Sequence, residues 1–508
     1  MIFLIITDII VVLGTNFQYY SVASLNNPSS VVIEWINSTL AQNPGPKSEF
    51  WDLQTLWTAA VSSFFVGCVP GSLLIGTVAD SVGRRNGLII TGLLCTIGCS
   101  LQLTCRWVAN VALLIAGRFL IGVSTGLCGG ICATFLSEIA PTRFRGACGA
   151  TMTLAMFLGQ LCGLIFTLPE TLGSALWWPF GISLIPGITA LVMAIALVFV
   201  PKSPKRLYLT TANKIKAEKA LIFYQGADQA KSSWRILKLE ALALGTGVEK
   251  RSNDGERGRW GPLVCLLTQK KYRKPLLITM VAIIGLHICG VFPIMAYSSD
   301  IFSQVGLSHA NSRYASIGLG VVPFLVQLPL TYAIERYGRR PLTLTGLYGM
   351  VASQLILVGS TEIAIKYPAQ ARQALWISCG SLFAFNAFFC IQAPVPVILT
   401  TELFDQTNRA VATAVAYSLR FVVGALLVLT FSWFKSRVGI ALSFLPFIIG
   451  TLFCAVFLHI YMPETNNKSL VDIRYKHWLP ARLRANAEVS PVYDLGIRPN
   501  TSNAVQKF

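Results

Sequence analysis

Acidic and arginine residues recur at matching spacings in the two halves of the chain. Each half contains an acid four residues before an arginine and, further on, an acid seven residues before an arginine. The pairs are Asp80 with Arg84, Glu138 with Arg145, Glu335 with Arg339, and Glu402 with Arg409. A planar guanidinium can hold two partners at once, so such pairs can tie the ends of neighbouring helices together. The repeat predicts two similar bundles that rock about a central site.

The elements that position these charges are long apolar segments. The 508 residues are 54% hydrophobic and only 12% charged, and the mean hydropathy is +0.61. This composition is too apolar for a soluble protein of this size and predicts a membrane protein. At about 20 residues per span, we expect twelve spans, six per half, over residues 2–22, 57–79, 87–105, 109–135, 147–168, 177–200, 275–302, 314–334, 342–363, 375–401, 410–434 and 439–462.

The basic residues are concentrated between the two halves. The net charge is +19, and the segment 202–274 is rich in Lys and Arg, which the positive-inside rule assigns to the cytoplasm. With an even number of spans, both termini are then cytoplasmic. The segment 23–56 lies outside as a loop, and its sequon at Asn37 is the expected glycosylation site. The sequons at Asn467 and Asn500 fall on the cytoplasmic side.

These patterns predict an all-α membrane protein with twelve transmembrane helices in two pseudo-symmetric six-helix bundles. We expect the first bundle over 1–200, a cytoplasmic linker over 201–274, the second bundle over 275–462 and a cytoplasmic tail over 463–508. Within the linker, apolar residues at helical spacing predict short surface helices over 213–224 and 233–244.

The motifs together resemble those of the sugar-porter branch of the major facilitator superfamily, the family of the facilitative glucose transporters. The resemblance covers nearly the whole chain to about residue 470 and rests on short signatures at Gly117-Arg118-Phe119, Glu138 to Gly146, Glu335 to Arg340, Glu402 to Arg409, and Pro463-Glu464-Thr465. It implies alternating access of a central site to the two sides of a membrane.

The resemblance also implies salt bridges that close an inner gate. The implied gate residues are Asp80, Arg84, Arg85, Arg118, Glu138, Arg145, Glu335, Arg339, Arg340, Glu402 and Arg409. One position departs from the family pattern. After the sixth span, the family has an acid where this chain has Lys202, which reverses a charge and removes one link from the expected network.

The family's sugar ligands are almost all replaced. Hydroxyl-binding Gln, Asn, Trp and acidic positions fall on Leu286, His287, Phe292, Thr153, Pro323, Phe389, Val397 and Gly424. A buried hydroxyl left without a partner costs about 1–3 kcal/mol, so a tight hexose site of the family type is hard to build from these residues. The remaining polar candidates for substrate binding are Gln160, His287, Asn386, Gln392 and Arg420, each of which is also compatible with helix packing.

Arg420 is the most informative of these candidates. It lies about ten residues into the eleventh span, roughly 15 Å deep at the helical rise. An arginine at that depth costs about 2.5–3.5 kcal/mol on insertion scales, so it needs a water-filled cavity or a partner. Two interpretations stay open: a bond to a neighbouring group or to carbonyls beside the Pro394/Pro396 break, and direct binding of the solute.

The predicted function is facilitated diffusion of a small polar solute, most simply a monosaccharide (hexose). The proton-coupled members of the family carry an Asp where this chain has Ser21, and Asp8 lies too near the start to replace it, which favours uniport. The alternatives are a related transporter for another solute such as an organic anion, and a non-transporting nutrient receptor. We expect no enzymatic activity, cofactor, metal or nucleic-acid partner. The predicted partners are the lipid bilayer and the solute. The expected location is the plasma membrane.

Overall fold

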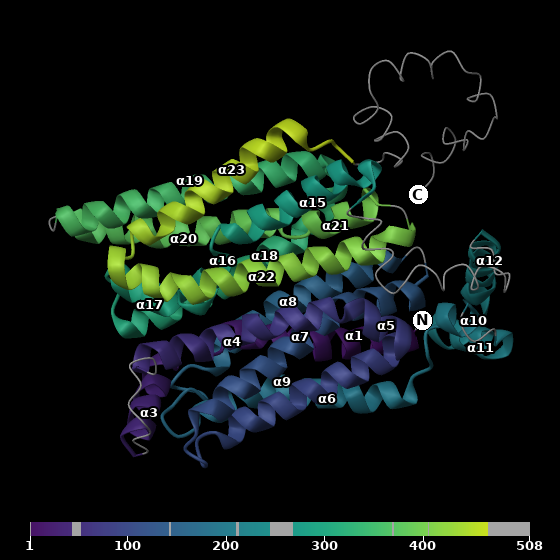
Figure 1. Ribbon diagram of the computed structural model, residues 1–508, viewed down its shortest axis with the longest axis horizontal. Coiled ribbons are helices and arrows are strands. Elements are labelled where there is room, and N and C mark those ends of the chain that lie inside the picture. Colours follow the sequence, from purple (N-terminus) through teal and green to yellow (C-terminus); the bar gives the residue numbers. More distant parts are fainter. Residues whose placement is uncertain are drawn as a thin grey trace.

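The computed structural model describes residues 2–42, 52–141, 144–209, 213–243, 268–367, 370–404 and 406–465. The helices of the first half of the chain, in purple and blue, lie on one side of Figure 1, and those of the second half, in green and yellow, lie on the other. Twelve helical segments among the described residues are long and apolar enough to cross a membrane. Each of them overlaps one of the expected spans, which confirms the predicted fold class.

The first half contains six spans and two short additional helices. The first span is made of three pieces: α1, the 3-10 helix η1 and α2. The bounds are α1 (Ile2–Asn16), η1 (Phe17–Tyr19), α2 (Tyr20–Ala23), α3 (Ser29–Gln42), α4 (Leu53–Leu73), α5 (Ile75–Ser81), α6 (Arg84–Thr104), α7 (Val111–Ile139), α8 (Arg145–Phe166) and α9 (Trp178–Phe199).

The second half contains the other six spans, two of which are broken in the middle. The bounds are α15 (Lys270–Ile288), α16 (Val291–Ala296), α17 (Ser298–Val305), α18 (His309–Tyr337), α19 (Arg339–Lys366), α20 (Ala371–Gln392), α21 (Val395–Glu402), α22 (Gln406–Val438), η4 (Leu442–Phe444) and α23 (Leu445–Tyr461). The proline-containing break between α20 and α21 lies where the sequence predicts it, because proline cannot continue a helical hydrogen-bond ladder.

The segment between the halves forms α10 (Pro204–Leu209), α11 (Lys214–Gln225) and α12 (Ala227–Ala243). α11 overlaps the expected helix over 213–224, and α12 overlaps the expected helix over 233–244 but begins at Ala227. Burial raises the pKa of Tyr224, so its hydroxyl stays protonated and donates to the Pro201 carbonyl at 2.6 Å. This bond holds α11 against the end of the first half. We call the helix ends beside α10–α12 the inner ends, and the opposite ends the outer ends (Figure 1).

The outer segment between the first two spans differs from the expected loop, because residues 29–42 form α3. Val32 and Ile36, one turn apart, are fully buried, and Trp35 packs on Trp178 with ring centroids 5.2 Å apart. The apolar residues of this segment therefore share one helical face, and their burial stabilises the helix. Asn37 is exposed.

Large apolar side chains also cover the outside of the molecule. Exposed examples are Ile188, Ile195, Phe199, Ile449 and Phe453. A soluble protein rarely exposes so much apolar surface, whereas a bilayer covers it. Hydrophobic burial therefore does not hold the helices together inside the membrane, and close packing takes over that role.

Candidate functional site

The second half carries a compact charge cluster at its inner end. The Arg339 guanidinium meets Glu402 at 2.9 and 3.1 Å, and Thr465 donates its hydroxyl to the same carboxylate. Glu464 accepts the backbone N–H groups of Arg339 and Arg340 at 3.0 and 3.1 Å. Its carboxylate therefore caps the start of α19, where free N–H groups and the helix dipole favour negative charge.

The first half carries a matching cluster. Arg84 lies 3.2 Å from Glu138 and 3.7 Å from Asp80, and Ser203 donates its hydroxyl to Glu138. Thus Arg84, Glu138 and Ser203 correspond to Arg339, Glu402 and Thr465 in the other half. Each cluster joins helices of one half only, so it fixes the shape of that half's inner end.

The two clusters differ at the capping position, as the Lys202 departure leads us to expect. Gly83 and Gly338 precede α6 and α19 with φ of 99° and 89°, a conformation that glycine adopts without strain. Beside Gly338 lies the Glu464 carboxylate, whereas beside Gly83 lies the Arg206 guanidinium. Arg206 donates to the carbonyls of Asp80 and Ser81 at the end of α5, at 3.4 and 3.1 Å. Within the described residues, no carboxylate accepts the first N–H groups of α6 as Glu464 does for α19, so the first cluster lacks one anionic contact.

Three predicted gate arginines make other contacts than the expected salt bridges. Arg85 donates to the Val200 carbonyl at 2.8 Å and the Arg340 side chain to the His459 carbonyl at 2.6 Å. Both carbonyls lie at or near helix ends, where acceptors are free. Arg118 donates to the Ser21 carbonyl at 3.0 Å. It lies twenty residues before Glu138 on the same helix, about 30 Å away at the helical rise, so its assignment to the inner gate is wrong.

Three further predicted gate residues have side chains outside the described part of the structure. They are Arg145, Glu335 and Arg409. Their backbones belong to α8, α18 and α22. Their role in the gate stays a prediction.

A helix break brings side chains of the second half to the centre of the molecule. Gly290 separates α15 from α16 with a left-handed φ of 79°, and the space beside it is filled by the Phe447 ring. Gln354 donates to the Cys289 carbonyl, freed by the break, at 2.6 Å. The break places His287 and Phe292 next to each other, with stacked rings 5.2 Å apart.

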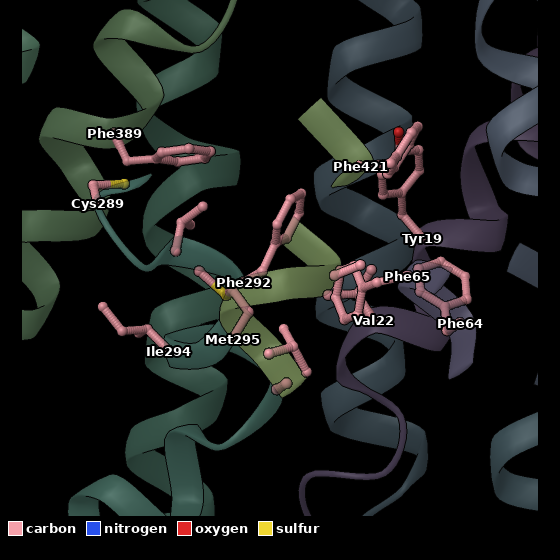
Figure 2. Packing of buried hydrophobic residues seen from close by; sticks show 14 of the residues in the cluster. Tyr19, Val22, Phe64, Phe65, Cys289, Phe292, Ile294, Met295, Phe389 and Phe421 are labelled. Atoms are coloured by element: carbon pink, nitrogen blue, oxygen red, sulfur yellow. The ribbon is translucent and has the colours of Figure 1, made fainter. Parts of the chain in front are cut away.

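Aromatic side chains from both halves meet at this place. Phe292 points toward Phe65 of α4, at a centroid distance of 4.8 Å (Figure 2). Phe65 contacts Phe64 edge-on at 5.2 Å. Phe292 also occupies the space that any side chain on Gly424 would need. The glycine at position 424, one of the replaced sugar-ligand positions, therefore leaves room for the Phe292 ring. Both replacements make the centre more apolar.

Arg420 lies at the edge of this aromatic cluster. Its guanidinium carbon is 5.6 Å from the Tyr19 ring centroid, 5.8 Å from Phe292 and 5.4 Å from Phe421. Cation–π contacts contribute about 0.5–2 kcal/mol each, so three of them can offset an insertion cost of about 2.5–3.5 kcal/mol. The aromatic rings give the N–H groups of Arg420 no acceptor. Within the described residues, Arg420 forms neither a hydrogen bond nor an ion pair, and its Nε is buried.

The other substrate-binding candidates divide into two groups. Asn386 donates to the Leu319 carbonyl and Gln392 to the Ala282 carbonyl, and these bonds join helices within the second half. His287 donates its Nδ1–H to the Ile283 carbonyl at 2.8 Å, while its buried Nε2 has no partner among the described residues. Gln160 is buried on α8. The structure brings His287 and Arg420 to the same aromatic cluster, whereas Asn386 and Gln392 pack between helices.

The outer ends of the two halves are bridged by hydrogen bonds. Asn26, after α2, accepts the Ser299 N–H at 3.0 Å, and its side chain also bonds to Ser298. Gln54 donates to Ser432 at 2.6 Å. Sequence reasoning missed these residues, although an Asn-Asn-Pro motif directly after an apolar span is a signal for a polar contact at a helix end. The bridges hold the outer side of the two halves together.

Replacing Asn26 by Ala is expected to loosen this outer closure. The side-chain bonds that Asn26 makes to the second half disappear, which shifts the population toward the outward-open form by the free energy of those bonds. Asn27→Ala is the matched control, because the Asn27 side chain donates to the Leu164 carbonyl of its own half and, among the described residues, makes no bond to the second half. Reaction of Gln54→Cys with an impermeant thiol reagent measures the opening. Equal reaction rates in the Asn26→Ala and Asn27→Ala backgrounds contradict the bridging role.

A cavity of about 350 Å³ lies at these outer ends between the two halves. Its lining includes Asn26, Gln54, Tyr297, Asp300, Arg313 and Lys435. The ammonium of Lys435 pairs with Asp300 and lies 5.8 Å from the centroid of the Tyr297 ring. The Tyr297 hydroxyl is buried and has no hydrogen-bond partner in the described part of the chain.

The fold matches solved structures of known class. It superimposes on the proton:xylose symporter XylE of the major facilitator superfamily, bound to 6-bromo-6-deoxy-D-glucose, with a TM-score of 0.72 at 22% identity, covering 92% of this chain and 98% of that one. An inward-open structure of XylE from E. coli matches with a TM-score of 0.71 at 21% identity, with the same coverages. The helices therefore form a major facilitator fold.

The family follows from the sequence. Residues 7–476 match the model of the family described as sugar (and other) transporter. The human facilitated glucose transporter member 4 is 31% identical over 95% of this chain and 92% of its own length. The human member 3 is 31% identical over 90% of this chain and 89% of its own length. The chain belongs to the sugar transporter family and is a multi-pass integral membrane protein.

Proposed function

We propose that this chain moves a monosaccharide down its concentration gradient by facilitated diffusion. The observation that carries the proposal is the match to the sugar transporter family over residues 7–476, together with relatives named as facilitated glucose transporters. The central cluster between the halves is the proposed solute site, with Arg420 and His287 as its polar groups.

The geometry supports alternating access as the mechanism. Hydrogen bonds such as Asn26–Ser299 join the halves at their outer ends, while the inner clusters each lie within one half. The halves can thus rotate about the centre as rigid units, breaking the outer bonds and keeping each inner cluster intact. The broken helices α15–α16 and α20–α21 are the elements that can bend during this rotation.

Reconstitution into liposomes tests the function. We expect uptake of labelled monosaccharide from a panel that includes D-glucose, rising to equal concentrations on both sides and no further. An imposed pH gradient leaves the final level unchanged if the mechanism is uniport. Binding of solute without any flux points to a receptor, and accumulation driven by a pH gradient contradicts facilitated diffusion.

We propose a plasma-membrane location with both termini cytoplasmic, based on the positive-inside rule and the cationic linker. The orientation predicts glycan on Asn37 of α3, whose side chain is exposed. Glycosidase treatment of the protein from eukaryotic cells is expected to give one shift in mobility, which Asn37→Gln abolishes. If the shift persists in Asn37→Gln, the orientation is reversed or another site carries the glycan.

A further inference from the structure

Two arginines lie within the spans without an acidic partner among the described residues. Arg118 is fully buried, with Nε and Nη1 unpartnered, beside the Phe64 ring. Phe64, Phe65 and Phe292 follow one another between the halves (Figure 2). Arg420 contacts the Phe292 end of this series. Lys435, by contrast, has Asp300 as its counter-ion. At the central cluster itself, the Arg420 guanidinium therefore has no acidic counter-ion among the described residues.

The geometry of Arg420 indicates which group compensates it. Three aromatic rings lie close to the guanidinium, and none of them supplies an acceptor for its N–H groups. A guanidinium matches a carboxylate with two parallel hydrogen bonds. A neutral hydroxyl matches it less well, because it offers one uncharged oxygen where a carboxylate offers two charged ones. The unfilled coordination of Arg420 therefore fits a solute with one carboxylate.

The outer cavity provides an independent observation. Its titratable lining consists of Tyr297, His309, Arg313 and Lys435, with Asp300 as the one carboxylate in this lining. Since Asp300 neutralises Lys435, the Arg313 charge remains, and it attracts anions to the mouth between the halves. Tyr297 lines this cavity, and α16, which ends one residue earlier, carries Phe292. The cavity and the central cluster are therefore joined by a single short helix.

We propose that the sugar carried by this chain bears a carboxylate, as hexuronates do, and that Arg420 binds that carboxylate. The inference rests on the proposed sugar transport. The aromatic rings then cover the apolar C–H face of the sugar ring. A sugar phosphate fits less well, because it carries about −1.5 to −2 charges against the one guanidinium at the site.

Charge movement in the wild-type protein tests the proposal. Liposomes containing the purified protein receive labelled D-glucuronate or D-glucose under an imposed membrane potential. Because a uniported monoanion carries one negative charge, an inside-positive potential is expected to accumulate glucuronate above the outside concentration. The same potential leaves neutral D-glucose at equal concentrations. Unlabelled glucose 6-phosphate is expected to inhibit glucuronate uptake less than unlabelled glucuronate does.

Variants test the role of Arg420. Arg420→Gln is expected to reduce glucuronate uptake about tenfold, the effect of losing one charge-assisted contact, and to change uptake of a neutral sugar much less. Arg420→Lys does not restore glucuronate uptake, because lysine lacks the planar fork. Arg313→Gln lowers glucuronate uptake mainly at low ionic strength. Arg372→Gln, an exposed arginine at the start of α20, is the matched control.

The outcomes separate the two proposals. If D-glucose is transported but glucuronate is neither transported nor inhibits that transport, the acidic-sugar proposal is overturned and the proposed sugar transport stands. Absence of flux for every sugar overturns the proposed function. An equal loss of neutral and acidic sugar uptake in Arg420→Gln, at a normal amount of folded protein, shows that Arg420 acts in packing and overturns its role as the carboxylate ligand.

Discussion

Replacing Arg339 by Ala is expected to reduce transport about tenfold or more, while the protein still reaches the membrane. A tenfold loss corresponds to about 1.4 kcal/mol. The change removes both contacts to Glu402, at 2.9 and 3.1 Å. Glu402 then keeps the Thr465 hydroxyl but loses the counter-charge that it has among the described residues. Without this link α19 and α21 no longer hold a fixed inner end, so the half cannot move as one unit. Initial rates of uptake in liposomes measure the effect.

Arg336→Ala is the control for this prediction. Arg336 is exposed at the end of α18, and its one contact among the described residues is to the neighbouring Tyr337 ring, at 5.8 Å. Its loss changes the same net charge without touching the cluster. If Arg339→Ala and Arg336→Ala transport at the wild-type rate, the arginines act as topology signals and the gate assignment is rejected.

Replacing Gly122 by Val is expected to eliminate most of the folded protein. Gly122 and Gly126 on α7 face Gly67 and Gly71 on α4. A Cβ on any of these four glycines would overlap a backbone carbonyl of the other helix. Backbone atoms cannot swing away as a side chain does, so the helices have to separate. Overpacking of this kind costs about 1–3 kcal/mol or more, and in a bilayer close packing is the main force between helices.

Thermal unfolding of the detergent-solubilised protein measures this second effect. Gly149→Ala is the matched control, since Gly149 is a helical glycine of the same half with open space around it. We expect the control to be neutral or slightly stabilising, because alanine favours a helix over glycine. A Gly122→Val protein that unfolds at the wild-type temperature contradicts the close contact between α4 and α7.

Much of the architecture follows from local features of the sequence. Apolar runs of about 20 residues suffice to predict spans. Backbone N–H and C=O groups find no water in the bilayer core, so the segment must pair them internally as a helix. The repeated spacing around Arg84 and Arg339 predicts the inner clusters, since acid and arginine lie at helix ends where pairing is favourable. The apolar positions of 29–42 also repeat at helical spacing, but turn-forming Asn and Pro residues on both sides obscure α3.

The centre of the site was decided by tertiary structure. Nothing in the residues around Phe292 shows that its ring reaches Phe65 of the other half, or that it fills the space over Gly424. Likewise, a buried arginine has the same sequence signal whether it meets an acid, a carbonyl or an aromatic ring. Arg118 bonds to the Ser21 carbonyl and Arg420 lies among three rings, because the packing of separate helices fixes which groups meet. Local spacing sets the secondary structure, whereas contacts between residues hundreds of positions apart set the chemistry of the site.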